Sequence, residues 1–363
     1  MELATLIPMR LLKGKQCVLV GDPQQLPATT FAKGSDVSQY QRSLFQRLEA
    51  TGQPVHLLDT QYRMHPSISL FPRVIFYDEQ LKDGGNVSAP AYERCVVVFE
   101  TRPPPRRHRF FPFASRASPD RAVVLHRPFH THPCLAPFTF FHLEESAAAR
   151  KDGGHSLGNR GEARLAVRLF DLLESLSLAD AAGAGGGDHS DFGERVAVIT
   201  PYKEQVSVLS REFGLSRPGV EIGTVDGFQG REKSIVIVST VRSAGSSGVG
   251  FLKDVRRMNV ALTRAKHGMY VIGNETALSR NEQWGRLVRH AKAAGHFVHL
   301  KNADADLDTA RPEAPVRYSG GGGEGLRIGH AAAPPPGSAE AASEPAPKRP
   351  RAAADEFFTR RGE

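Results

Sequence analysis

The chain has 363 residues, 40% of them hydrophobic, which suits one large domain or two smaller ones, each with its own core. Its net charge of +8 neither requires nor excludes a nucleic-acid partner, because seven arginines and one aspartate between Arg102 and Arg127 supply most of it. Three cysteines without a CxxC pair argue against a disulfide scaffold, and no apolar run approaches the roughly 18 residues of a membrane span, so a soluble, intracellular protein without a membrane partner is expected.

Short apolar runs recur along the chain and are nearly continuous rather than alternating, as in strands that are covered on both faces. Helical patterns lie between them, so the sequence predicts an α/β fold with a parallel, doubly wound sheet. The expected strands are Gln16–Asp22, Val55–Thr60, Arg195–Thr200, Ser234–Thr240 and Met269–Gly273.

Two helices can be delimited by their end signals and apolar faces. The first is expected to have Thr200 as its N-cap and to end at Gly214, with Val206, Leu209 and Phe213 on one face. In the second, Met258, Ala261, Leu262 and Ala265 recur at helical spacing and form the expected buried face. Arg257 and Arg264, seven residues apart, then share one flank of that helix and can reach across a cleft; a solvated helix charge is the alternative.

Three stretches show neither the apolar runs of strands nor the periodicity of helices. Residues 95–137 form an atypical basic, proline-rich insert, with a core at 95–127 that is either translated intron or a basic loop. Residues 181–188 are expected to form a flexible loop, and residues 301–363 a disordered tail rich in Gly, Ala and Pro.

Polar loops follow the expected strands in the segments GDPQQLP, DTQYRMHP, TPYKEQ and TVRS. In open parallel sheets, ligands bind just outside the carboxyl ends of the strands. Loops also begin at strand ends for purely structural reasons, but four such loops in one chain favour a binding site. A further loop, DGFQGRE, places Gly227 and Gly230 among several polar side chains, where they allow close backbone approach.

In this order, the segments VLVGDPQQLPAT, LLDTQYRMHPSIS, VAVITPYKEQV, IGTVDGFQGREKSIVIVSTVRS and FLKDVRRMNVALTRAKHGMYVIGN resemble motifs III to VI of the superfamily 1B helicases. Among these, the chain most resembles the senataxin-type RNA/DNA helicases. The resemblance covers residues 1–94 and 138–300. It implies that residues 1–50 are the end of a first RecA-like domain and residues 51–300 a second RecA-like motor domain.

The resemblance implies an ATP site between two RecA-like domains. Tyr62 corresponds to the ring that stacks on adenine, and Arg63 to an arginine that contacts the γ-phosphate. Gln25 corresponds to the glutamine near the attacking water, and Arg264 to a second arginine finger. Glu232 and the neighbouring Gly230 correspond to nucleotide-binding positions, with Glu232 at the ribose.

The resemblance also implies a surface that binds nucleic acid and movement along a single strand. Thr200, Pro201 and Thr224 correspond to positions near the nucleic-acid backbone. Closure of the cleft around ATP and its reopening would move the two domains along single-stranded RNA or DNA, or unwind RNA–DNA hybrids. Backbone contacts make such motion largely independent of sequence. The expected location is the nucleus, with the cytoplasm also open; the PKRPR segment, Pro347–Arg351, fits a nuclear import signal.

The sequence departs from the family in two motifs. It holds no GxxxxGK(S/T) loop for the phosphates, and the Asp-Glu pair that binds Mg²⁺ is expected just upstream of Met1. The Mg²⁺ ligands for ATP are therefore expected from the missing first lobe, which becomes an expected partner, and the chain alone is expected not to hydrolyse ATP. It is either a fragment of a larger helicase or a non-catalytic module that binds nucleic acid or protein.

No metal site is expected within the chain itself. His126, His130, His132 and Cys134 form a short tract whose spacing fits no standard zinc finger. Trp284 is expected to pack within the domain rather than to stack on a base.

Overall fold

The computed structural model describes ten segments of the chain, and every structural statement below refers to them. They are residues 2–11, 16–28, 42–88, 94–97, 123–126, 128–150, 156–183, 192–245, 248 and 250–316. The expected nuclear import signal, Pro347–Arg351, lies outside these segments.

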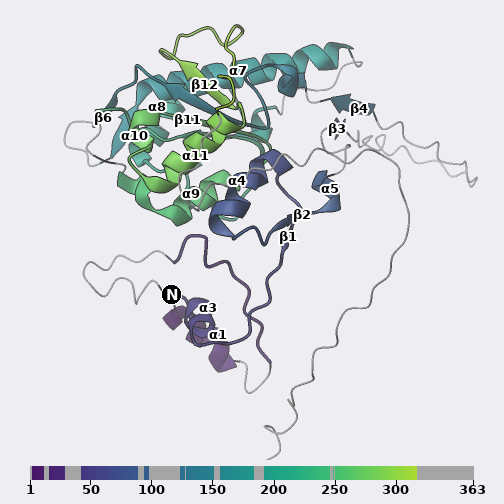
Figure 1. The fold of residues 1–363 in the computed structure, drawn as a ribbon, viewed down its shortest axis with the longest axis vertical. Coiled ribbons are helices and arrows are strands. Elements are labelled where there is room, and N and C mark those ends of the chain that lie inside the picture. Colours follow the sequence, from purple (N-terminus) through teal and green to yellow (C-terminus); the bar gives the residue numbers. More distant parts are fainter. Residues whose placement is uncertain are drawn as a thin grey trace, which may run out of the picture. The chain divides into compact units, whose positions relative to one another are not determined.

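A six-stranded sheet forms the centre of the described chain (Figure 1). Every neighbouring pair of its strands is parallel, so the predicted doubly wound α/β fold of a RecA-like helicase domain is confirmed. Its strands, in spatial order, are β12 (Phe297–Leu300), β5 (Phe138–Leu143), β11 (Ala265–Gly273), β10 (Lys233–Ser239), β8 (Val196–Thr200) and β9 (Glu221–Thr224).

The inner strands are apolar throughout because both faces of the sheet are covered. Ala197 and Ile199 of β8 join one core cluster, whereas Val196 and Val198 join the other. Strands β10 and β11 divide their residues between the two clusters in the same alternating way. This two-residue period within a continuous apolar run explains why these strands show no polar face in the sequence.

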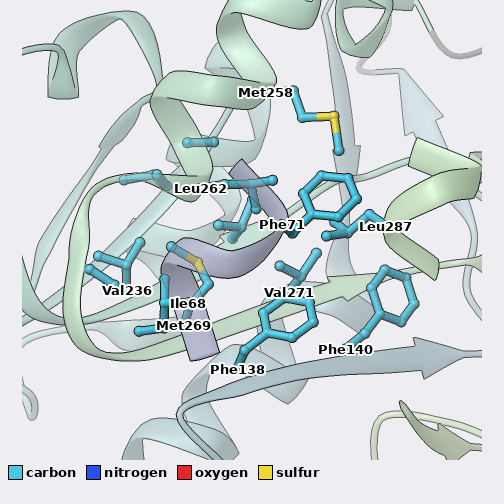
Figure 2. Close-up of a cluster of buried hydrophobic side chains, with 14 of the residues drawn as sticks. Ile68, Phe71, Phe138, Phe140, Val236, Met258, Leu262, Met269, Val271 and Leu287 are labelled. Carbon is cyan, nitrogen blue, oxygen red and sulfur yellow. The ribbon is translucent and has the colours of Figure 1, made fainter. Parts of the chain in front are cut away.

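Three helices cover one face of the sheet, and two cover the other. Figure 2 shows Ile68 and Phe71 from α4 (Pro66–Phe76) packed with Met258 and Leu262 from α9 (Val255–Leu262), beside Phe138 of β5. Helix α11 (Glu282–Ala293) completes this layer, while α7 (Arg160–Gly183) and α8 (Lys203–Phe213) lie on the opposite face. Trp284 of α11 is buried and donates its indole N–H to the Leu252 carbonyl at 2.9 Å, as expected for a packing residue.

The remaining elements are short. The helices are α1 (Glu2–Leu11), α3 (Leu44–Ala50), α5 (Gly85–Ser88), α10 (Glu275–Leu278) and the 3₁₀ turns η1 (Pro128–Thr131), η2 (Gly193–Arg195), η3 (Asp226–Phe228) and η4 (Gly250–Lys253). The strands pair as β1 (Thr60–Gln61) with β2 (Lys82–Asp83), β3 (Arg94–Val97) with β4 (Val123–His126), and β6 (Ala148–Arg150) with β7 (Leu157–Asn159). None of the helices in the described segments is both long and apolar enough to cross a bilayer.

Two predicted strands are wrong. Gln16–Asp22 has no regular structure, and of Val55–Thr60 only Thr60 belongs to a strand. Val18 and Val20 are 85% and 84% exposed, and no strand in the described segments pairs with their backbone. Apolar composition alone does not make a strand where a hydrogen-bonding neighbour is lacking. The other three predicted strands correspond to β8, β10 and β11.

The helix boundaries also differ from those predicted. Helix α8 begins at Lys203 with Tyr202 as its N-cap, not at Thr200, because Thr200 still belongs to β8. It ends at Gly214 as predicted, with φ at +58°. Helix α9 ends at Leu262, so Ala265 is buried as the first residue of β11 rather than on the helix.

The three irregular stretches are partly ordered. Phe129, Cys134 and Leu135 are buried in the core, so the expected insert at 95–137 ends before residue 128; residues 98–122 lie outside the described segments. Helix α7 includes residues 181–183 of the expected flexible loop. Residues 301–316 pack on the domain through Ala303 and Leu307 instead of starting a disordered tail. The rest of that loop and tail lies outside the described segments.

Candidate nucleotide site and nucleic-acid face

Gln61 folds the chain so that Tyr62 and Arg63 face outward. Its side-chain carbonyl accepts the backbone N–H groups of Arg63 at 3.0 Å and Met64 at 2.8 Å. Its amide group donates to the Met64 carbonyl and to Asp83 Oδ1. Met64 is buried and anchors this turn, and α4 follows at once with the His65 ring capping its first turn. The apolar run therefore ends in a rigid turn with a ring and a guanidinium group on its outer side.

Tyr62 presents one open aromatic face. The side chain is 65% exposed, and its ring packs on Gly84, where a Cβ atom would lie 2.4 Å from the ring carbons. Asn86 donates its side-chain N–H to the Tyr62 carbonyl at 2.9 Å, which fixes the backbone behind the ring. A supported ring with one exposed face suits stacking on a flat heterocycle.

Arg63 links this turn to Glu232, which precedes β10, and to Thr263, which follows α9. Its Nε donates to Glu232 Oε2 at 2.5 Å, and a terminal nitrogen donates to the Thr263 carbonyl at 3.1 Å. Glu232 also pairs with Lys266 at 2.7 Å. The hydrogen bond from Lys266, aided by Arg63, lowers the pKa of Glu232, so this carboxylate is ionised at neutral pH.

Arg264 lies beneath Arg63, in the short link between α9 and β11. It is only 2% exposed and donates to the Val260 carbonyl, the Arg231 carbonyl and Thr263 Oγ1 at 2.8–3.2 Å. Burial, together with the charge of Arg63, lowers its pKa to about 10, so it remains charged at neutral pH. The two arginines converge at Thr263, which lies 200 positions from Arg63 in the chain.

Arg257 does not share this cluster, because α9 ends before Arg264 and the seven-residue helical spacing does not apply. It pairs with Asp226 at 2.9 Å and with Asp254 at 3.2 Å instead. The predicted common flank for Arg257 and Arg264 is therefore wrong.

The loop that carries Gln25 docks on the same end of the domain. Gln25 Nε2 donates to Asp22 Oδ2 at 2.8 Å, and this oxygen also accepts the Tyr77 hydroxyl at 2.7 Å. Asn259 donates to the Tyr77 oxygen and to the Gln24 carbonyl, each at 3.0 Å. Asn259 belongs to α9, the helix that ends just before Arg264, so the loop with Gln25 docks on the helix that leads to the buried arginine.

The sequence patterns did not single out Tyr77 or Asn259. Tyr77 is the C-cap of α4, and Asn259 is a fully buried polar residue of α9. The signal that could have found Asn259 is this polar residue on the buried face of α9, because such a group needs a partner.

The chemistry of the donors fits a nucleoside triphosphate. An open ring suits the base, and two guanidinium groups suit phosphate oxygens. The two carboxylates at this cluster, Asp22 and Glu232, accept hydrogen bonds or ion pairs from Gln25, Tyr77, Arg63 and Lys266.

Within the described segments, no three His, Cys, Asp or Glu side chains gather as a metal site. Cys134 is buried, which raises the pKa of its thiol to about 11, and His132 Nδ1 lies 3.2 Å from its sulfur. His130 Nε2 instead lies 3.1 Å from the His267 carbonyl, and the side chain of His126 lies outside the described residues.

The expected nucleic-acid residues lie at the carboxyl ends of β8 and β9. Thr200 is fully buried, so it supports this edge from below and offers no contact surface. Pro201 and Thr224 are partly exposed, and Thr224 Oγ1 accepts the Gly227 N–H at 3.2 Å. Gly230 has a φ of +81° and open space where a Cβ atom would lie, so it permits close approach of a ligand.

Comparison with known proteins gives matches over most of the chain. A family model described as an AAA domain matches residues 40–276, and a second model, also described as an AAA domain, matches residues 1–33. The chain is 36% identical to Helicase SEN1 of Saccharomyces cerevisiae over 322 residues, and 39% identical to a probable helicase of Dictyostelium discoideum over 319 residues. It is 34% identical to ATP-dependent helicase upf1 of Schizosaccharomyces pombe over 301 residues.

These alignments cover 87%, 87% and 81% of this chain, but only 12%, 28% and 27% of the three relatives. The chain thus spans less than a third of each of them. The matched AAA-domain model covers more than half of the chain, and the motifs III to VI occur in order on a RecA-like fold. The chain therefore belongs to the Upf1-like superfamily 1 helicases.

Proposed function

We propose that this chain is the second motor domain, with the end of the first, of an ATP-dependent helicase that moves on single-stranded RNA or DNA and unwinds RNA–DNA hybrids. Residues 1–50 would close the first RecA-like domain, and residues 51–316 would form the second. The separate matches to residues 1–33 and 40–276 support this division. The names of the relatives, which include helicases of the SEN1 and upf1 types, support the class of activity.

The single observation that carries the proposal is the convergence of Arg63 and Arg264 at Thr263, beside the open ring of Tyr62. Tyr62 would hold the adenine, and both arginines would stabilise charge on the transferred γ-phosphoryl group. Gln25 would orient the attacking water, while Glu232 would release Arg63 and bind the ribose beside Gly230. Phosphoryl transfer needs such positioning and charge stabilisation more than covalent help from the protein.

ATP would bind together with Mg²⁺, whose ligands we assign to a first RecA-like lobe that acts as partner of this domain. The sequence holds no GxxxxGK(S/T) loop, so hydrolysis would need that lobe as well. Closure of the two lobes around ATP would move Pro201 and Thr224 along the nucleic-acid backbone, with Thr200 as their buried support. A nuclear location is part of this proposal.

The test is ATP turnover, with and without single-stranded RNA, by this chain and by a form extended at its N-terminus. We expect RNA-stimulated turnover by the extended form. Arg63→Lys should slow it by about 10³-fold or more, because an arginine finger contributes about 10³–10⁵ in rate and lysine lacks its planar fork. Lysine at 63 can still pair with Glu232, so the variant should fold.

Arg160→Ala is the matched control, because Arg160 forms a surface pair with Glu212 and should leave turnover unchanged. An inert extended form would overturn the helicase proposal. The alternative function, a non-catalytic module that binds nucleic acid or protein, would then account for the fold.

A further inference from the structure

Phe251 exposes a large aromatic surface where the sheet ends. It lies in η4, in the connection that follows β10, and its side chain is 55% exposed. Most large apolar side chains of this domain are buried, so the exposure of this ring needs an explanation. The neighbouring segment is Pro201–Tyr202, directly after β8, which places the ring at the edge assigned above to nucleic acid.

The ring is held from behind. Tyr202 is buried and meets Phe251 edge to face, with ring centroids 5.7 Å apart. Arg242 donates its Nε–H to the Tyr202 hydroxyl at 2.7 Å, and its guanidinium group lies over the Tyr202 ring at 5.4 Å. Gly250 has a φ of +54°, a conformation that favours glycine, and a Cβ atom there would force the Arg242 guanidinium group away from its present position.

The other side of η4 is fixed by Leu252 and Trp284. Leu252 is buried in the core, and the Trp284 indole N–H donates to its carbonyl at 2.9 Å. A shallow apolar hollow lies beside Phe251, with Pro201, Val225 and Trp284 in its lining. The exposed ring thus sits on a rigid base next to an apolar recess.

The charge around the ring is positive. Residues 250–257 contain Lys253, Arg256 and Arg257. Arg257 pairs with Asp226 and Asp254, so the excess of positive charge comes from Lys253, Arg256 and the nearby Arg242. The Arg257 guanidinium group lies 5.8 Å from the Phe251 ring centroid. Among the described carboxylates, none pairs with Arg242. An exposed ring set among cations suits a ligand that combines flat bases with phosphates better than it suits an apolar peptide.

We propose that Phe251 is a stacking shelf for one base of a bound single strand. The base would lie on the exposed face of the ring, and the surrounding cations would contact the adjacent phosphates. Every base has a π-face, so such a shelf adds affinity without reading sequence. This inference rests on the proposed function, in that it names how the same nucleic-acid face holds its ligand.

The experiment measures binding of the full chain to a fluorescein-labelled single-stranded RNA, and to an oligonucleotide of the same length with abasic sites throughout. Phe251→Ala should weaken binding to the normal strand by about 5- to 150-fold, since one stacked base contributes about 1–3 kcal/mol. It should leave binding to the abasic strand unchanged, because the phosphates are retained. Phe251→Trp should bind the normal strand at least as tightly as the unaltered chain.

Leu215→Ala is the matched control. Leu215 is fully exposed and lies between α8 and β9, ahead of the amino end of β9, whereas Phe251 lies by the carboxyl end of β8, so the loss of Leu215 should change neither affinity. If the unaltered chain and Phe251→Ala bind the normal strand equally tightly, Phe251 does not stack on a base. Its exposed ring would then be a surface for a protein partner. Failure of the unaltered chain to bind either strand would overturn the proposed function together with the shelf.

Discussion

Glu162 is a fully buried carboxylate at the start of α7, and it holds the turn that follows β10. Its Oε2 accepts the Ser239 hydroxyl at 2.6 Å and the Val241 N–H at 2.8 Å. Val241 has a φ of +71°, which is rare for a β-branched residue, and Asn159 donates to its carbonyl at 3.0 Å. The buried network therefore stabilises a strained backbone that leads directly to Arg242.

Burial raises the pKa of Glu162 to about 8, although the hydrogen bonds from Ser239 and Val241 partly oppose this rise. An acid with a raised folded pKa stabilises the fold fully below its unfolded pKa, near 4.5, and loses that contribution as the pH rises toward 8. We expect the free energy of unfolding to fall between pH 5 and pH 8. In Glu162→Gln, which keeps an acceptor for both hydrogen bonds, this fall should be markedly smaller.

The free energies of unfolding of the unaltered chain and of Glu162→Gln are measured by urea unfolding at pH 5, 6, 7 and 8. The buried His290 also titrates, and burial lowers its pKa to about 4, so its contribution acts in the opposite direction and below pH 6.5. It is present in both proteins and cancels in their difference. Parallel pH profiles for the two proteins would show that Glu162 is not the responsible group.

At the scale of helices and strands, the sequence predicted β8, β10 and β11 and missed β5 and β12 at one side of the sheet. Strands β8, β10 and β11 are recognisable because burial on both faces demands unbroken apolar runs. In β5, the buried Thr139 and His142 interrupt the run, and in β12 the exposed His299 occupies one of only four positions. Such short or interrupted runs do not stand out from loops.

The candidate site was predictable to a similar extent. The motif order predicted that Tyr62, Arg63 and Arg264 belong together; Arg63 and Arg264 both donate hydrogen bonds to Thr263, and Tyr62 precedes Arg63 in the chain. The support from Tyr77 and Asn259 was missed because their partners are 55 and 182 positions away. A local pattern gives no information about such pairings, which depend on the docking of whole elements.

The docking of the Asp22–Leu26 loop on α4 and α9 gives a prediction for Tyr77→Phe. The Tyr77 hydroxyl donates to Asp22 and accepts from Asn259, and its loss removes a hydrogen bond to a charged group, which contributes about 1.5–3 kcal/mol. We expect the backbone amides of Gln24 and Gln25, which bond to Asp22, to exchange with deuterium at least about tenfold faster.

Tyr62→Phe is the matched control for this measurement, because the Tyr62 hydroxyl takes part in none of the described hydrogen bonds. It should leave the exchange of Gln24 and Gln25 unchanged. Unchanged exchange in Tyr77→Phe as well would mean that Tyr77 does not hold the loop on the domain.

At the scale of the whole molecule, the compact unit extends beyond the last strand of the sheet. The contacts define one unit from Met1 to Tyr318. Arg168 donates to the Ala303 and Ala305 carbonyls, each at 2.6 Å, and the Val316 N–H donates to the Lys292 carbonyl at 3.1 Å. Residues 301–316 thus tie α7 to α11 across the edge of the sheet, and their composition, rich in Ala and Asp, concealed this role.

A chain that ends at Tyr318 should therefore unfold at the same temperature as the full chain, whereas one that ends at Leu300 should unfold at a clearly lower temperature. The longer deletion exposes the core cluster that Ala303 and Leu307 cover.

Leu307→Ala tests the same contact without deletion and should lower the free energy of unfolding by about 2–5 kcal/mol. Leu215→Ala, at a fully exposed position, should cost less than about 0.5 kcal/mol. If the two truncated chains melt at the same temperature, residues 301–316 do not stabilise the domain, and its boundary is residue 300 as first predicted.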